Sequence, residues 1–218
     1  YWSVFEAKDL KNERVNKRPL FEAQQIKRGR ITTADGVLIA QSVGSGRGAS
    51  RQYVRRYPEG TLYGHPIGYS FAEQGNSEFE ASHNDELIGE GSEFTSILDE
   101  LRGRKQEGNN IRTNIDSVAQ QTAVDLLAGR PGAVIAMVPS TGEVKAMVSE
   151  PPYDPNTIPD DLGPLSNTPG SPLLDRASQG QYPPGSTFKL VTATAALDSG
   201  SVSADELIDS PASLTIQG

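Results

Sequence analysis

The stretch Tyr182–Lys189, which reads YPPGSTFK, constrains this chain more than any other segment. Its two prolines and its glycine form a rigid turn, and they predict that a helix begins directly behind it. Residues 190–199 are apolar almost all round, and Gly200 supplies a stop signal. Because a helix without a polar face belongs inside a domain, this segment is predicted to be a core helix.

Ser186 and Lys189 are the candidate catalytic residues. Lys189 stands where a capping box would carry an acidic residue, so its charge opposes the helix macrodipole. Residues three apart share a helix face, which places the amine beside the hydroxyl. Such an amine can accept the serine proton and turn a weak alcohol into a nucleophile, and the helix start offers backbone N–H groups to an oxyanion.

The spacing alone is weak evidence for catalysis. With 21 serines and 7 lysines in 218 residues, a Ser-x-x-Lys pair arises readily by chance. A serine N-cap followed by a lysine that reaches into solvent remains an open alternative.

Charge is distributed unevenly along the chain. The formal net charge of −8 divides into +7 for residues 1–56 and −15 for residues 57–218. The basic arm could favour anionic lipid head groups or nucleic acid, but the pI of 4.8 is too low for nucleic acid and no RNA-binding signature accompanies the arm. A solvated basic face near a membrane anchor is the preferred interpretation. Aromatic residues at the start are typical of the water-side edge of a membrane anchor. No nucleic-acid partner is predicted.

The residue types that hold metals and cofactors lack the required patterns. The chain contains no cysteine, which excludes disulfides and thiol chemistry. His65 and His83 stand apart from any ligand cluster, and a structural role is predicted for His65. The glycine-rich residues 43–51 lack the ending of a phosphate-binding loop. We therefore predict neither a metal nor a cofactor.

The spacing of apolar and polar residues, together with the positions of turn-forming residues, predicts an α+β fold. Expected elements are a hairpin around Asp35-Gly36, a strand near residues 53–57, a helix after Asp116 ending before Gly129, a fully buried central strand over 132–139, and a half-exposed return strand over 143–149. Residues 151–180 show no strong element, and the polar stretch 98–110 is predicted to separate two domains.

Several segments together resemble one family. YPPGSTFK is similar to the first active-site motif of the class B penicillin-binding proteins, a motif shared with serine β-lactamases. Upstream blocks match the same family: RGRI at Arg28, RRYPEG at Arg55, HPIGY at His65, and GAVIAMVPSTGEVKAMVSEPPYDPN from Gly132. Arg28 and Arg30 are expected to be structural.

The resemblance implies a fold and an activity. Residues 1–109 would form the non-catalytic pedestal, a dimerisation-type domain of strands and loops. Residues 110–218 would form the first part of a β-lactamase-like α/β sandwich. The implied protein is a peptidoglycan D,D-transpeptidase, with Ser186 forming an acyl-serine and Lys189 as base. Its ligands would be stem peptides and β-lactams, and its pedestal would contact other cell-wall synthesis or division proteins.

The family's two other motifs, Ser-x-Asn and Lys-Thr/Ser-Gly, do not follow Lys189 in this sequence. This chain alone is therefore expected to be an inactive N-terminal piece. The family also implies a location outside the bacterial cell membrane, held by an N-terminal transmembrane helix that is absent here. Two alternatives stay open: a non-catalytic cell-wall scaffold, and a serine D,D-carboxypeptidase or β-lactamase-type hydrolase.

Overall fold

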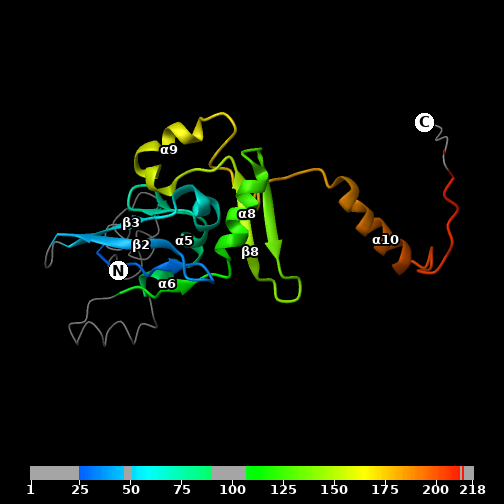
Figure 1. The fold of residues 1–218 in the computed structure, drawn as a ribbon, viewed down its shortest axis with the longest axis horizontal. Helices are drawn as coiled ribbons and strands as arrows, with labels where there is room; N and C mark the ends of the chain where they lie inside the picture. The colour runs from blue at the N-terminus through cyan, green and yellow to red at the C-terminus, as the bar shows by residue number, and fades with distance from the viewer. Residues whose placement is uncertain (1–24, 47–50, 90–106, 212, 214–218) are drawn as a thin grey trace, which may run out of the picture. The chain divides into compact units, whose positions relative to one another are not determined.

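The computed structural model describes residues 25–46, 51–89, 107–211 and 213 (Figure 1). The chain forms two compact units, residues 1–180 and residues 181–218. The basic arm before residue 25, residues 47–50 of the glycine-rich loop and most of the predicted boundary segment lie outside the described residues.

A four-stranded sheet organises the first part of the larger unit. Its order is β3-β2-β1-β6, made of β3 (Gln52–Arg56), β2 (Leu38–Ser45), β1 (Ile31–Thr32) and β6 (Ile111–Arg112). The predicted hairpin is confirmed, because β1 and β2 pair antiparallel on either side of the turn at Gly36. β6 pairs with β1 in parallel, which brings residues 80 positions apart into register. Only the folded chain reveals that pairing.

Short helices and one small hairpin cover this sheet. In chain order they are η2 (Gly60–Tyr63), α4 (Gly64–Ile67), β4 (Ser70–Phe71), β5 (Gly75–Asn76), α5 (Glu78–Ser82) and α6 (Asn84–Ile88). They enclose an apolar core in which Ile31, Tyr63 and Leu87 are almost completely buried. Glu78–Ile88 folds although its composition is acidic, because Leu87 and Ile88 are buried and anchor α6.

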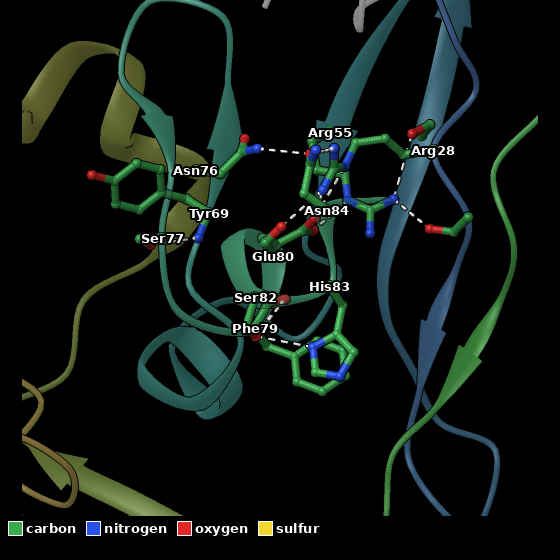
Figure 2. A network of polar contacts seen from close by, with 12 residues as sticks. Arg28, Arg55, Tyr69, Asn76, Ser77, Phe79, Glu80, Ser82, His83 and Asn84 are labelled. Atoms are coloured by element: carbon green, nitrogen blue, oxygen red, sulfur yellow. Dashed lines mark hydrogen bonds and ion pairs between the residues drawn. The ribbon is translucent and has the colours of Figure 1, made fainter. Parts of the chain in front are cut away.

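A buried ionic cluster joins the sheet to α5 (Figure 2). Glu80, fully buried, accepts from the Arg28 guanidinium at 3.0 Å and from Arg55 Nε at 2.6 Å. Arg28 also donates to Asn84 Oδ1 at 2.8 Å. Burial lowers the pKa of Arg28, while the neighbouring Glu80 carboxylate opposes that shift. The predicted structural role of Arg28 is confirmed, whereas the side chain of Arg30 is exposed.

The predicted helix and its following strands are also confirmed. α8 (Ser117–Leu127) begins at Asp116, whose side chain accepts from Ala119 N at 2.9 Å as an N-cap. β7 (Gly132–Met137) and β8 (Val144–Glu150) form an antiparallel hairpin, and α8 packs across one face of it (Figure 1). A small core of Ala123, Ala146 and Val148 lies between them.

The predicted exposures of these two strands are reversed. β7 was expected to be buried on both faces, yet Ile135 and Met137 are 52% and 55% exposed. β8 was expected to be half-exposed, yet Val148, Ser149 and Glu150 are buried. The reason is that, among the described strands, β7 has only β8 as a neighbour, while β8 is also contacted by α4.

Residues 151–180 contain elements that the sequence pattern did not indicate. η3 (Pro155–Thr157) and α9 (Ile158–Ser166) occupy the stretch predicted to lack structure. Gly163 and Pro164 weaken the helical pattern, but Pro159 fits the first turn and Ile158 is fully buried. Tertiary burial thus overrides poor local propensity.

Candidate active site

The two predicted catalytic residues lie at the start of the apolar helix, in the smaller unit. Ser186 belongs to η4 (Gly185–Phe188), one turn of 3-10 helix, and Lys189 is the first residue of α10 (Lys189–Asp198). Gly185 has a φ of 54°, a left-handed conformation that glycine adopts at little cost. The prolines and this glycine therefore turn the chain directly into the helix, as predicted.

The local backbone sets Ser186 and Lys189 on one face. The Lys189 backbone N–H donates to the carbonyl of Ser186, and side chains three apart in a 3-10 turn eclipse each other. Both residues are exposed. Among the described residues, no hydrogen bond joins their side chains. The backbone thus places both residues at the start of the same helix on an open surface, and their catalytic roles stay predictions.

The expected burial of α10 is wrong for this chain. Phe188, Leu190 and Val191 are 54%, 71% and 56% exposed, and no residue of the helix is buried. A helix buries its apolar surface only against another apolar surface, and the one other described element in residues 181–218 is the short 3-10 helix η4 that leads into α10. The amine of Lys189 therefore stands in solvent in this chain.

The segment that leads to this motif is firmly anchored in the larger unit. Asp175, 1% exposed, accepts from Ala177 N at 2.9 Å and from the Ser178 hydroxyl at 2.6 Å. Asn156 bridges back to the end of β3: its side chain donates to the Tyr57 carbonyl and accepts from Tyr57 N. These contacts hold residues 154–156 and residues 175–178 in place.

Gln120 is the least obvious of the positioning residues. It is fully buried in α8, and its amide donates to the carbonyls of Leu62 and Met147, both at 2.9 Å. Its side-chain oxygen accepts from Met147 N at 2.8 Å. One side chain therefore fastens α8 to both η2 and β8. A glutamine inside a helical apolar row is the only sequence signal of this role.

The histidines are structural, as predicted for His65. Its ring is buried, donates from Nε2 to the Pro151 carbonyl at 3.2 Å, and meets Tyr153 edge-on. Burial lowers the pKa of His65, so the ring stays neutral at neutral pH. His83 stacks on Phe79. Within the described ranges, no cluster of three metal-ligating side chains occurs, and no helix has the length and apolarity to cross a membrane.

Comparison with protein families divides the chain in two. Residues 28–111 match the family described as "Penicillin binding protein A dimerisation domain". Residues 132–217 match the family described as "Penicillin binding protein transpeptidase domain". The second match contains Ser186 and Lys189.

Individual relatives carry related names. The chain is 36% identical to "Peptidoglycan D,D-transpeptidase PbpA" of Mycolicibacterium smegmatis, over 95% of this chain and 45% of that protein. It is 41% identical to "Peptidoglycan D,D-transpeptidase MrdA" of Escherichia coli over 49% of this chain and 18% of that protein. The chain thus spans at most about half the length of these curated relatives.

Solved structures with similar folds are also penicillin-binding proteins or transpeptidase domains. The penicillin G acyl-enzyme complex of penicillin-binding protein A from M. tuberculosis matches with a TM-score of 0.69 and 34% identity, over 80% of this chain and 43% of that one. A D,D-transpeptidase domain from Eggerthella lenta matches with a TM-score of 0.69 and 37% identity, over 87% and 41%. With one part matching the dimerisation domain and the other the transpeptidase domain, the chain belongs to the penicillin-binding proteins.

Proposed function

We propose that the protein is a peptidoglycan D,D-transpeptidase in which Ser186 is the nucleophile and Lys189 its general base. The observation that carries the proposal is the pair itself. A hydroxyl and an amine stand one 3-10 turn apart, on a proline-glycine turn that enters a helix. They lie within the segment that matches a transpeptidase domain.

The first half-reaction would transfer an acyl group to the enzyme. Ser186 Oγ bonds to the carbonyl carbon of the penultimate D-Ala of a stem peptide while neutral Lys189 Nζ takes the hydroxyl proton. When the tetrahedral intermediate collapses, the bond to the terminal D-Ala breaks, and the leaving amine takes the proton back from Lys189. The product is a stem peptide esterified to Ser186, plus free D-Ala.

The second half-reaction would form the cross-link. An amine of a neighbouring stem peptide attacks the ester carbonyl and gives its proton to Lys189. Ser186 Oγ then leaves and recovers that proton. A β-lactam would stop the cycle after the first step, because ring opening leaves an acyl group on Ser186. One relative of this chain, penicillin-binding protein A from M. tuberculosis, is solved as acyl-enzyme complexes with penicillin G and with imipenem.

The proposed transpeptidase function also implies a domain arrangement and a cellular location. We place the non-catalytic pedestal in residues 1–109 and the start of the catalytic domain in residues 110–218, which the ranges of the two family matches support. The site of action would be the extracytoplasmic face of the cell membrane. The pedestal would be the part that contacts other cell-wall synthesis proteins.

Labelling by a fluorescent penicillin tests the catalytic assignment. In the full-length gene product, Ser186→Ala should abolish covalent labelling seen on a denaturing gel. Lys189→Ala should slow acylation by roughly 100-fold or more, the usual contribution of a general base. Ser203→Ala, which truncates another exposed serine of the same unit, should label like the wild type.

The same experiment separates the alternatives. Labelling that survives Ser186→Ala would place the nucleophile elsewhere. A wild-type protein that takes no label would leave only a scaffold role. Transfer of the acyl group to an added D-amino acid, measured by mass spectrometry, would distinguish a transpeptidase from a hydrolase, which passes the acyl group to water alone.

A further inference from the structure

Glu78 adopts a left-handed backbone conformation, which is unusual for a residue other than glycine. Its φ is 47°, and it is the first residue of α5. The residues on either side fix the backbone here. Ser77 N donates to the Tyr69 carbonyl at 2.9 Å, Ser77 Oγ accepts from Tyr69 N at 3.0 Å, and Glu80 is held in the buried ionic cluster. A left-handed residue with a Cβ is strained, and such strain persists where the surrounding structure enforces it, often at functional positions.

The side chain of Glu78 connects α5 to the segment that precedes the candidate nucleophile. Its Oε1 accepts from Gln179 Nε2 at 2.9 Å, and the two residues lie 101 positions apart. Burial raises the pKa of Glu78, and the nearby carboxylate of Asp175 raises it further. Backbone conformation and electrostatics thus both oppose a glutamate at this position. The interaction that a glutamate makes here and a glycine could not make is the hydrogen bond to Gln179.

Gln179 lies where the chain leaves the larger unit, which ends at Gly180. In chain order, the bond from Gln179 to Glu78 is the last hydrogen bond of the larger unit in the described residues. Two residues then lead to the segment YPPGSTFK, whose two prolines have a fixed φ. Because this connection is short and stiff, the position of Gln179 determines where the segment with the nucleophile begins.

We propose that Glu78 is a positioning residue for the acyl transfer, because its hydrogen bond to Gln179 fixes the point at which the chain departs toward Ser186. Glu78 touches neither the substrate nor the reacting atoms, and it acts through Gln179. The inference rests on the proposed function. A role in stability alone explains Glu78 less well, since a glycine at this position would adopt the same backbone conformation without strain.

The substitution Glu78→Gly in the full-length gene product separates these two explanations. It relieves the left-handed strain, so the midpoint of thermal unfolding should stay the same or rise. Acylation by a fluorescent penicillin should nevertheless slow about fivefold, the effect of losing one hydrogen bond of ordinary net strength. The loss should lie in the first-order acylation rate constant at saturating penicillin, with the non-covalent binding constant unchanged. A purely structural residue would not lower this rate constant while the unfolding midpoint is maintained.

Three further variants make the test specific. Ala128→Gly is the matched control, because Ala128 also has a left-handed φ, 51°, at an exposed position after α8, and it should acylate like the wild type. Glu78→Gln keeps an oxygen that can accept from Gln179, and it should retain the acylation rate to within about twofold. Gln179→Ala should slow acylation as much as Glu78→Gly does, and the double variant should be no slower than either single variant.

Amide hydrogen exchange gives a measurement that does not require acyl transfer. The backbone N–H of Gln179 donates to the Asp175 carbonyl at 2.8 Å, and that of Ala177 donates to Asp175 Oδ1 at 2.9 Å, so both amides report opening of this turn. Their exchange should become about fivefold faster in Glu78→Gly and in Gln179→Ala, as expected for one lost hydrogen bond, and should not change in Ala128→Gly.

The outcomes distinguish this inference from the proposed function. Unchanged exchange in Glu78→Gly and Gln179→Ala would overturn the positioning role and leave the proposed acyl transfer intact. Wild-type acylation rates in these two variants, or additive effects in the double variant, would also overturn it. Labelling that survives Ser186→Ala would instead remove the proposed function, and the positioning role would be lost with it.

Discussion

Glu80 lies between two guanidinium groups in the interior of the pedestal. Arg28, Arg55 and Glu80 are 7%, 3% and 0% exposed, so one buried negative charge faces two buried positive charges. Tyr57 adds a hydroxyl that donates to Glu80 Oε1 at 3.3 Å. The cluster tolerates its desolvation only because each carboxylate oxygen accepts at least two hydrogen bonds.

Neutralising Glu80 should therefore destabilise the larger unit strongly. Glu80→Gln leaves Arg28 and Arg55 buried without a counter-charge, and removing one partner of a buried pair costs about 3–5 kcal/mol. Urea unfolding followed by circular dichroism would measure the loss. Glu86→Gln, at an exposed position of α6, is the matched control and should change the free energy of unfolding by less than about 0.5 kcal/mol. Equal stabilities for the two variants would contradict a structural role for the cluster.

At the scale of elements, the larger unit is held by two chain segments that run side by side. Residues 27–32 and 107–113 are joined by a parallel bridge at Lys27 and Glu107, by Gly108 N to the Lys27 carbonyl at 2.9 Å, and by the parallel pair β1 and β6. Glycine makes this approach possible. A Cβ at Gly29 would overlap the Asn109 carbonyl, and one at Gly108 would overlap the Leu87 carbonyl.

Gly29→Ala is consequently expected to separate the two segments. The obstacle is backbone, which cannot rotate away like a side chain, so the cost should be about 3 kcal/mol, the upper end for overpacking. Thermal unfolding and amide exchange at residues 108–111 would measure it. Gly163→Ala in α9, where a Cβ meets open space, should be neutral or up to about 1 kcal/mol more stable. Unchanged exchange in Gly29→Ala would show that the segments do not need this close contact.

At the scale of the whole molecule, the described chain exposes apolar surface on β7. Val134 packs toward α8, while Ile135 and Met137 fall on the opposite face because strand side chains alternate. In the described residues only β8 pairs with β7, so its other edge offers free N–H and C=O groups. An exposed apolar edge strand of this kind pairs readily with other chains.

Self-association of the chain should therefore depend on this face. Ile135→Lys is expected to lower the concentration-dependent mass seen in sedimentation velocity, while changing the free energy of unfolding by less than about 0.5 kcal/mol. Ser140→Lys, in the exposed turn between the strands, adds the same charge without touching the apolar face. If both variants reduced association equally, net charge rather than the β7 face would be responsible.

Local sequence signals were sufficient to predict several turns and helix starts of the fold. Asp35-Gly36 indicated the first hairpin, Asp116 indicated the start of α8, and the prolines and Gly185 indicated the start of α10. The candidate pair Ser186 and Lys189 also followed from spacing, since three residues of helical backbone bring two side chains to one face. Each of these features depends on interactions within a few residues.

Contacts between distant residues decided the rest. The pairing of β6 with β1, the salt bridges of Glu80 to Arg28 and Arg55, and the hydrogen bond between Glu78 and Gln179 each join segments that lie far apart in sequence. The burial of an element also depends on distant residues. α10 and β7 have the apolar composition of core elements, but they are exposed here. A sequence pattern records which surface an element can bury, and only the presence of a packing partner determines whether that surface leaves water.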